Sequence, residues 1–267
     1  MKAYLTYFKL KFITGLQYRS AAWAGIATQF FFGFVYIMVY IAFYESGGKD
    51  IPMTLSQTIT YLWLNQALLA LVNQFTRDEE LFKMVKEGTI SYELARPKNL
   101  YFMWYFKIWG QKLSGVALRF LPLIIVTSLL PYPYGLGLPV SCISFIVFLL
   151  SLTIGSLLVT SLTVLYPIVA LTTMNEKGIV NLIITTADIL SGVVVPIPFF
   201  PLFLQKISRV LPFQYISDLP FRIYVGNIHI NSCVIPILIQ ITWLILLIIL
   251  GNVLMKKSLK RVVVQGG

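Results

Sequence analysis

Residues 140–171 read VSCISFIVFLLSLTIGSLLVTSLTVLYPIVAL and contain no charged side chain. A helix needs about 20 apolar residues to cross the hydrocarbon core of a bilayer, at a rise of about 1.5 Å per residue. The stretch is longer than a straight crossing requires, so we expect a transmembrane helix that tilts, kinks at Pro167 or projects beyond the bilayer. It indicates an integral membrane protein.

The composition of the whole chain agrees with this. Over 267 residues it is 58% hydrophobic and 12% charged, with a mean hydropathy of +0.81, whereas soluble domains are about half apolar and about one-quarter charged. Other apolar segments of spanning length lie at 22–44, 57–75, 113–130, 179–196 and 232–255. We therefore predict an all-α integral membrane protein with six transmembrane helices in a single domain, 1–267.

The basic residues fall mainly on one side of this topology. Of the 21 Lys and Arg residues, four fall on the side assigned as outer: Lys49, Lys206, Arg209 and Arg222. The other 17 fall on the opposite side, in the two terminal segments and in the loops after the second and fourth spans or at their edges. Cytoplasmic loops carry the excess of Lys and Arg in membrane proteins, so both termini are predicted to be cytoplasmic. The net charge of +11 thus reflects topology, and no nucleic acid is expected as a partner.

The first 20 residues, MKAYLTYFKLKFITGLQYRS, have the pattern of an amphipathic helix. Helical spacing places five apolar side chains on one side: Tyr4, Leu5, Phe8, Phe12 and Leu16. Such a helix can lie in the cytoplasmic interface of the membrane. The alternative is a simple cytoplasmic extension of the first span.

Several polar residues fall within or at the edges of the predicted spans: Asn65, Gln66, Asn73, Arg119 and Asp188. An amide that faced lipid would leave its hydrogen bonds unmade, so these side chains should face protein or water. Hydrogen bonding between helices is the simplest role, and lining a translocation path is the alternative. Asp188 is the one acidic residue deep in a span. It is expected to pair with a base such as Arg119 or to stay protonated, and the alternative is a proton or substrate contact.

The loop over residues 76–100 has strong local signals for a short helix from about 77 to 87. Thr76 and Glu79 have the spacing of a capping box, and Gly88 can end the helix in a left-handed conformation. Acidic residues in the first turn and lysines in the last match the helix dipole. The residues of this candidate site are Arg77, Asp78, Glu79, Glu80, Leu81, Phe82, Lys83, Val85, Lys86 and Gly88.

Three of these residues, Leu81, Phe82 and Val85, form a small hydrophobic patch on a loop that is too short to bury it in a core of its own. We expect the patch either to lie on the membrane surface or to insert into a groove on a soluble partner. In such a groove a few large apolar side chains dominate the affinity.

Two stretches carry a resemblance to a known family: EGTISYELARP at 87–97 and ILSGVVVPIPFFPLFLQKISRVLPF at 189–213. They resemble the permease subunits of type 2 ABC transporters, the exporter class, and within it small six-span bacterial permeases that work with a separate ATPase. The resemblance implies a protein of the bacterial plasma membrane that exports an amphipathic drug, peptide or lipid-like substrate. The implied partners are a cytoplasmic ABC ATPase dimer, which would hold ATP and Mg, a second copy or a related permease, and membrane lipid.

The resemblance also assigns segments. Residues 1–20 correspond to an interfacial elbow helix, and residues 77–87 to a coupling helix that docks in a cleft of the ATPase. Residues 196–231 correspond to short re-entrant helices on the outer side, between the fifth and sixth spans. Irregular backbone at membrane depth requires protein or water around it, and a plain extracellular loop is the alternative. The prolines that would end the fifth span and shape the re-entrant segment are Pro196, Pro198, Pro201 and Pro212.

In this arrangement the charged residues Asp218, Arg209 and Arg222 mark the return of the chain to water. The sequence offers no enzyme chemistry of its own. It has no G-x-x-x-x-G-K-S/T phosphate loop, so no cofactor is expected on this chain and the energy comes from elsewhere. A single histidine, His229, leaves no cluster for metal ligands or histidine catalysis. The alternative functions are a membrane-embedded enzyme and an ATP-independent transporter or channel.

Overall fold

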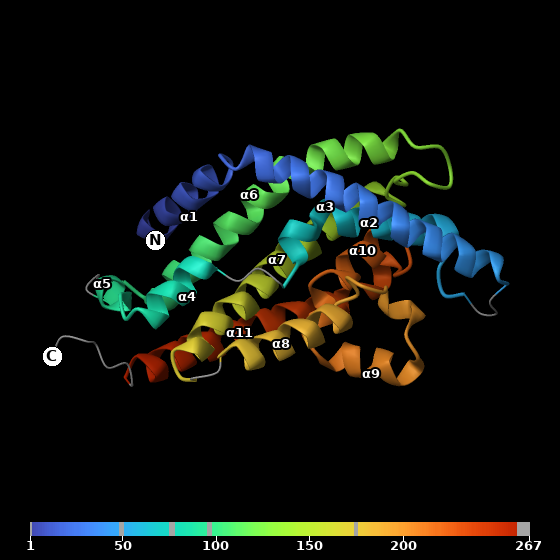
Figure 1. Ribbon diagram of the computed structural model, residues 1–267. Helices are drawn as coiled ribbons and strands as arrows, with labels where there is room; N and C mark the ends of the chain where they lie inside the picture. Colours follow the sequence, from blue (N-terminus) through green and yellow to red (C-terminus); the bar gives the residue numbers. More distant parts are fainter. Residues whose placement is uncertain (1, 48–50, 75–77, 95–97, 174–175, 261–267) are drawn as a thin grey trace.

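The computed structural model describes residues 2–47, 51–74, 78–94, 98–173 and 176–260, and no strand occurs within these ranges (Figure 1). Short 3₁₀ turns lie at Ile197–Phe199, Phe213–Tyr215 and Ile230–Ser232. The α-helices are α1 (Lys2–Gly15), α2 (Arg19–Glu45), α3 (Leu55–Val72), α4 (Glu79–Lys86), α5 (Ile90–Leu94), α6 (Leu100–Ser128), α7 (Cys142–Ala170), α8 (Glu176–Leu190), α9 (Leu202–Val210), α10 (Asp218–Tyr224) and α11 (Val234–Leu259).

Among the described residues, three helices are long and apolar enough to cross a membrane: α2, α7 and α11. α7 has 29 residues and continues through Pro167, which gives it a length of about 43 Å, more than the roughly 30 Å of a hydrocarbon core. It packs against α6, α10 and α11. The apolar stretch that identifies the class of protein from its sequence therefore forms a central helix of the bundle.

Two predicted spans differ from the helices found. The span predicted at 113–130 is the second half of α6, which begins at Leu100 and therefore extends much further toward its N-terminal end. The span predicted at 179–196 is too long, because α8 ends at Leu190. Gly192 then adopts a φ of +83°, a left-handed conformation that glycine reaches without steric cost. The fifth predicted span therefore ends before the proline cluster rather than at it.

The N-terminal helix is separate from the first long helix, since α1 ends at Gly15 and α2 begins at Arg19. α1 packs along α6. Phe8 contacts Trp109 of α6 with ring centroids 5.0 Å apart, and the Tyr4 hydroxyl accepts a hydrogen bond from the Asn99 backbone N–H at 3.0 Å. Leu5 does not share this face and is 54% exposed. The alternative, a simple cytoplasmic extension of the first span, therefore does not fit, because the helix is interrupted between Gly15 and Arg19.

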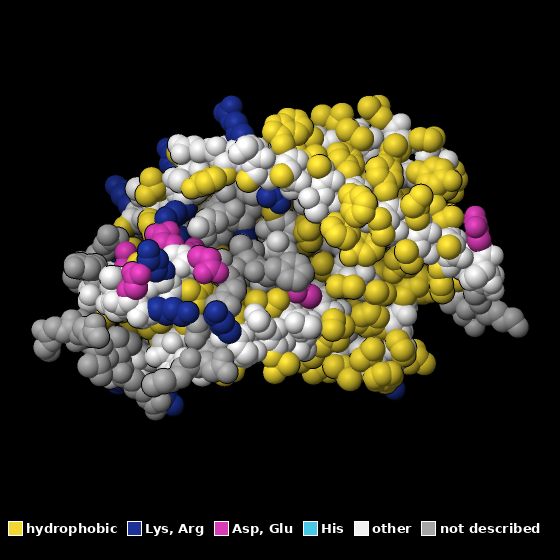
Figure 2. Space-filling model, viewed as in Figure 1, with side chains coloured by type: hydrophobic (Ala, Val, Ile, Leu, Met, Phe, Trp, Pro, Cys, Tyr) yellow, Lys and Arg dark blue, Asp and Glu magenta, His cyan; other side chains and the backbone are white. Residues whose placement is uncertain are grey.

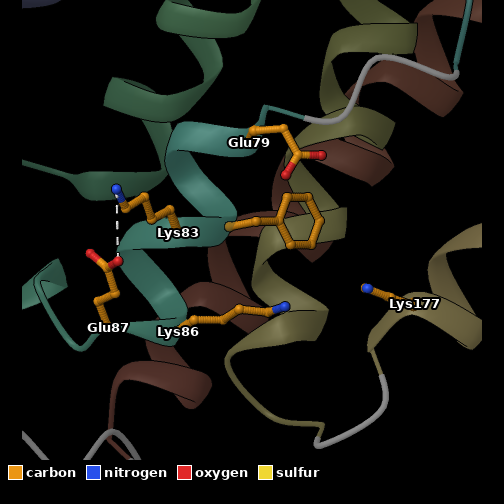
Figure 3. A pocket seen from close by; sticks show the side chains of 6 residues that line it. Glu79, Lys83, Lys86, Glu87 and Lys177 are labelled. Carbon is orange, nitrogen blue, oxygen red and sulfur yellow. Dashed lines mark ion pairs between the residues drawn. The ribbon is translucent and has the colours of Figure 1, made fainter.

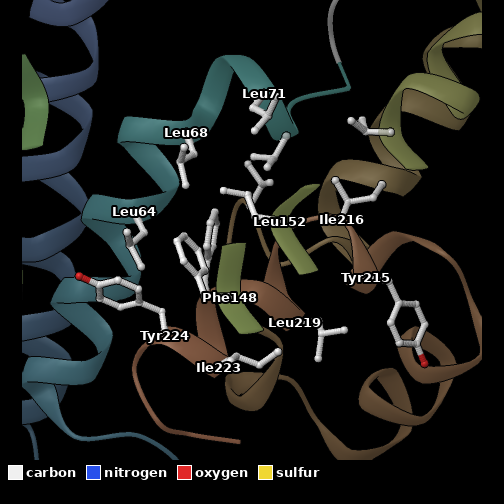
Figure 4. Close-up of a cluster of buried hydrophobic side chains, with 14 of the residues drawn as sticks. Leu64, Leu68, Leu71, Phe148, Leu152, Tyr215, Ile216, Leu219, Ile223 and Tyr224 are labelled. Atoms are coloured by element: carbon white, nitrogen blue, oxygen red, sulfur yellow. The ribbon is translucent and has the colours of Figure 1, made fainter. Parts of the chain in front are cut away.

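The main core joins α3, α7 and α10 (Figure 4). Leu64 and Leu68 of α3 and Phe148 of α7 belong to the same cluster of buried side chains as Leu219 and Ile223 of α10. At Gly155, α7 lies close to the turn that precedes α10, because a Cβ added there would lie 2.5 Å from the Ile216 carbonyl oxygen. The short α10 is therefore part of the core.

The proline cluster lies at the ends of short elements. Pro196 precedes the 3₁₀ turn Ile197–Phe199, Pro201 precedes α9, and Pro212 precedes the turn Phe213–Tyr215. These are positions where a missing backbone N–H costs little. The described residues 196–231 therefore form a chain of short helices, in which α9 lies at the edge of the molecule and α10 is packed inside (Figure 1).

Candidate functional site

α4 is specified by residues at its two ends. The Asp78 side chain accepts a hydrogen bond from the Leu81 backbone N–H at 3.0 Å, which satisfies a donor that the start of a helix leaves unpaired. Gly88 follows the helix with a φ of +70° and ends it as expected. The predicted capping box is wrong, because Asp78 rather than Thr76 is the N-cap. Thr76 and Arg77 lie outside the described residues.

The inner face of α4 is anchored in the protein's own core. Leu81 is 0% exposed and belongs to a cluster with Tyr101 and Tyr105 of α6 and Val164 of α7. Phe82 is 2% exposed and belongs to a second cluster, with Tyr166 of α7 and Val180 of α8. Val85 is partly buried against the first cluster.

The expectation that this patch lies on the membrane surface or in a groove of a soluble partner is therefore wrong for Leu81 and Phe82. A loop too short for a core of its own packs on α6, α7 and α8 instead.

The outer face of α4 is charged. Together with Lys177 of α8 it lines an open hollow with a volume of about 610 Å³ (Figure 3). Lys83 and Glu87 form an exposed ion pair at 3.8 Å, and Lys177 points across the hollow toward Lys86. The residues that line the hollow are Glu79, Phe82, Lys83, Lys86, Glu87 and Lys177. In the space-filling view, charged side chains gather at this end of the molecule, and hydrophobic side chains cover most of the other end (Figure 2).

A cluster of ion pairs connects α4 to two other helices. The Lys107 ammonium of α6 is fully buried and lies 2.9 Å from the Asp78 carboxylate and 2.8 Å from that of Glu80. Glu80 also pairs with Lys11 of α1 at 3.0 Å. A buried charge is tolerated only when it is paired and hydrogen-bonded. This four-residue cluster, called the ion-pair cluster below, therefore fixes the position of α4 relative to α1 and α6.

The charge state of Glu80 follows from the same contacts. Partial burial acts to raise the pKa of its carboxyl, but the hydrogen bonds and charges of Lys107 and Lys11 outweigh burial, so the pKa is lowered below 4.5. The carboxylate is therefore ionised at neutral pH and holds both lysines.

The polar residues predicted in the spans take several roles. The Asn65 side chain donates to the Val193 carbonyl at 2.6 Å and so joins α3 to the turn after α8. Gln66 is buried. Asn73 follows the last turn of α3, and its carbonyl accepts a hydrogen bond from the buried Lys112 at 2.6 Å. Helix-to-helix or helix-to-loop hydrogen bonding accounts for Asn65 and Asn73.

The expected pairing of Asp188 with Arg119 is not found. Asp188 is buried, and the nearby positive charge that acts on it is that of Lys112. Arg119 lies instead against α2, where an added Cβ on Gly25 would come within 2.6 Å of its Cζ. Lys112 and Arg119 both belong to α6 and share one side of it, but they lie seven residues apart, about 10 Å along the helix, and Lys112 is the one near Asp188.

A second buried charge lies at the opposite end of the molecule. Asp218 is 1% exposed and accepts hydrogen bonds from the Ile197 N–H and the Tyr61 hydroxyl, both at 3.1 Å. Arg222 pairs with it at 3.4 Å. Burial raises the pKa of the Asp218 carboxyl, against the opposing charge of Arg222. The expectation that Asp218 marks a return to water is therefore wrong.

The sequence alone did not reveal the ion-pair cluster or the role of Asp218. Lys11, Lys107 and Asp78 lie far apart in the chain. The sequence contains one indication of the cluster, which is that basic residues occur inside the otherwise apolar helix α6. Within the described ranges, no group of three His, Cys, Asp or Glu side chains is placed to hold a metal ion. Cys142 and Cys233 are free thiols.

Comparison with known proteins gives one match. The family model described as ABC-2 family transporter protein matches residues 24–266, which is nearly the whole chain. No curated protein and no solved structure matches. Members of this family are membrane components of ABC transporters that generally pair with a separate ATPase. The chain therefore belongs to the ABC-2 transporter family and is a membrane permease of ABC transport.

Proposed function

We propose that the chain is the permease subunit of an ABC exporter, and that α4 is the coupling helix through which a separate cytoplasmic ATPase dimer acts on the membrane helices. The substrate is an amphipathic drug, peptide or lipid-like molecule that leaves the cytoplasm. A second copy of the chain or a related permease completes the transmembrane part. ATP and Mg are held by the ATPase subunits.

The proposed topology has six spans: α2, α3, the second half of α6, α7, α8 and α11. The distribution of Lys and Arg supports a cytoplasmic location for both termini and for α4, in the plasma membrane of a bacterium. α1 is then the interfacial elbow helix. The short helices over 196–231 are re-entrant from the outer side, which fits the apolar exposed residues of α9, Leu202 and Phe203.

The observation that carries the proposal is the division of α4 into two faces. Its inner face is held by Leu81, Phe82 and the ion-pair cluster, so that α4 cannot shift without displacing α1 and α6. Its outer face leaves an open, charged hollow between Lys83, Glu87 and Lys177. A soluble protein that binds this hollow therefore has a direct mechanical connection to the spans.

The mechanism follows from differential binding. ATP shifts the transporter between two arrangements only to the extent that it binds one arrangement of the ATPase dimer more tightly than the other. Because α4 is fixed to α6, a displacement of α4 by the ATPase moves a helix whose second half crosses the membrane. This connection converts the change at the ATPase into a change in the path between protomers.

The test is co-purification. We expect the tagged permease, extracted from its native membrane in mild detergent, to retain an ATPase activity. The double variant Lys83→Glu with Lys86→Glu reverses two charges of the hollow and should lower the retained ATPase at least about tenfold, since charge complementarity governs such contacts. Lys206→Glu is the matched control, an exposed lysine of α9 at the other end of the molecule, and should retain the ATPase fully.

Two results would contradict the proposal. One is full ATPase retention and full transport by the double variant. The other is transport at the full rate by the purified chain without any ATPase, which would favour an ATP-independent transporter or channel. Turnover of a substrate by the chain alone would favour a membrane-embedded enzyme.

A further inference from the structure

A second hollow, distinct from the one beside Lys177, lies between α1 and α2 on one side and α3, α4 and α6 on the other. Its volume is about 550 Å³, within the range of sites for small ligands. Small residues form much of its apolar wall, among them Ala22 of α2, Ala70 of α3 and Gly115 of α6. We call it the elbow groove.

The elbow groove contains an arginine without a counter-ion. The Nε of Arg119 is buried from solvent and has no hydrogen-bond partner, and no ion pair of Arg119 is found among the described residues. Its guanidinium is held beside α2 because Gly25 has no side chain. A guanidinium in a predicted span is costly unless an acceptor meets it. The side chain therefore calls for an anionic group in the groove.

The charges of the groove are arranged along α6. The acidic residues Asp78, Glu79 and Glu80 line it at the level of Lys107. Arg119 lies twelve residues further along the helix, about 18 Å at 1.5 Å per residue. Lys112 lies between them and donates to the Asn73 carbonyl at 2.6 Å and to the Asn73 Oδ1 at 3.4 Å, which leaves one of its three ammonium donors. One end of the groove is thus acidic and the other is basic.

At the acidic end, one of the three carboxylates is available to bind a cation. Lys107 and Lys11 engage Asp78 and Glu80. Glu79, which lies between the two hollows and lines both, makes no ion pair within the described part of the chain. A ligand with a cation at one end and an anion at the other would satisfy both Glu79 and Arg119.

We propose that the elbow groove binds a zwitterionic phospholipid of the ethanolamine type, with its phosphodiester at Lys112 and Arg119 and its ammonium toward Glu79. Arginine and phosphate form strong, charge-assisted hydrogen bonds. In the proposed topology the acidic end faces the cytoplasm and Arg119 lies deeper. A phosphatidylethanolamine headgroup in the inner leaflet is oriented in the same way, with its amine toward the cytoplasm and its phosphate deeper in the membrane. The small residues of the wall leave room for the glycerol and the first acyl carbons.

This inference does not need the coupling function. The measurement uses the purified full-length permease without an ATPase, so a failure of the coupling proposal leaves it unaffected. We would follow thermal unfolding of delipidated protein in detergent against increasing phosphatidylethanolamine. Phosphatidylglycerol lacks the amine, diacylglycerol lacks the phosphate, and soluble phosphoethanolamine lacks the acyl chains.

We expect phosphatidylethanolamine to stabilise at the lowest concentration, phosphatidylglycerol at a higher one, and diacylglycerol not at all. Arg119→Gln should raise the half-effective concentration of phosphatidylethanolamine about ten- to a hundredfold, the effect of a lost charge-assisted hydrogen bond. For Arg119→Lys, the half-effective concentration of phosphatidylethanolamine should lie between those of the unmodified protein and Arg119→Gln. Glu79→Gln should remove the preference for phosphatidylethanolamine over phosphatidylglycerol. Arg209→Gln in α9 is the control and should behave as the unmodified protein.

Three results would overturn the proposal. Equal stabilisation by diacylglycerol and phosphatidylethanolamine would show that only acyl chains bind. Equal potency of soluble phosphoethanolamine would assign the groove to a free headgroup rather than a lipid. An unchanged half-effective concentration in both Arg119 variants would place the lipid elsewhere. If Arg119→Gln does not fold, Arg119→Lys and Glu79→Gln decide the matter.

Discussion

The two ends of the molecule each bury a charged side chain, but they satisfy it in different ways. At the α4 end, Lys107 is held by two carboxylates, at 2.9 Å and 2.8 Å, and one of these continues to Lys11. At the opposite end, Asp218 is held by a backbone N–H, a phenol hydroxyl and one longer contact to Arg222 at 3.4 Å. The first arrangement connects three helices through charges, and the second fixes a turn mainly through neutral donors.

The difference agrees with different roles. The ion-pair cluster connects α4, which has an open charged face, to α1 and α6, so that a force on one helix reaches the others. The Asp218 contacts connect α3, the turn before α9 and α10, which is part of the main core. The hollow that adjoins them is smaller, about 310 Å³, and is lined mostly by residues of this packed segment and of α11. One end is therefore suited to transmit a displacement, and the other to hold a packed segment in place.

The largest expected effect is at Lys107. Lys107→Met removes the shared partner of two carboxylates and leaves Asp78 buried without its counter-ion. We expect a loss of about 3–5 kcal/mol in the free energy of unfolding, measured by thermal or chemical unfolding in detergent. Lys98→Met, an exposed lysine just before α6, is the control and should change little. Equal stability of the two variants would contradict the proposed connection of α4 to α6.

A smaller effect is expected at the other end. Asp218→Ala leaves the Ile197 N–H without its acceptor, at about 1–3 kcal/mol for a buried donor left unsatisfied, whereas the Tyr61 hydroxyl keeps the Gly192 carbonyl at 2.9 Å. Hydrogen exchange over residues 196–217 should accelerate, while exchange in α4 should not. Asp218→Asn keeps one acceptor oxygen and should have the weaker effect. Acceleration in α4 as well would show that the two ends are not independent.

The dependence of stability on pH should have opposite signs at the two ends. Glu80 has a lowered pKa, so its contribution is complete above the unfolded value of 4.5 and is lost as the pH falls through the lower folded value. Asp218 has a raised pKa, so the folded state is favoured at low pH, and stability falls as the pH rises from 3.8 through the folded value. Unfolding midpoints of Glu80→Gln and Asp218→Asn, measured against pH, should therefore change slope in opposite directions. A change in the same direction would refute this assignment.

The smallest effect on stability is expected on the open face of α4. Lys83 and Glu87 form an exposed pair at 3.8 Å, and such pairs contribute about 0–1 kcal/mol. Lys83→Ala should therefore leave the unfolding midpoint almost unchanged while weakening the retention of the ATPase. A large loss of stability would mean that this face is structural.

Much of the fold could be predicted from the sequence. The apolar length of residues 140–171 predicts α7, and local charges and Gly88 predict α4 with only its cap misplaced. These features depend only on the residues of one helix and on those next to it in the sequence, so hydrophobic periodicity and turn residues are enough to predict them. The end of α8 was misplaced because the prolines of the cluster are conspicuous, whereas Gly192 ends the helix region earlier with a positive φ.

The site was less predictable because it depends on contacts between distant segments. Leu81 and Phe82 looked like an exposed patch, since nothing local indicates that α6, α7 and α8 approach α4. Asp188 and Arg119 looked like partners because they are opposite charges in spans. Their positions along the helices decide otherwise: Lys112, two turns before Arg119 on α6, is the base near Asp188, and Arg119 lies against Gly25 of α2.

The most direct test of the central claim is photo-crosslinking from the open face of α4. A photoreactive amino acid would be placed at Lys83 or Glu87 of the permease in its native membrane, with Lys206 of α9 as the control position. The account predicts a covalent adduct with a soluble ATPase from positions 83 and 87, and none from 206. No ATPase adduct from either position on α4, or equal adducts from all three, would contradict the claim that α4 couples the permease to its energy source.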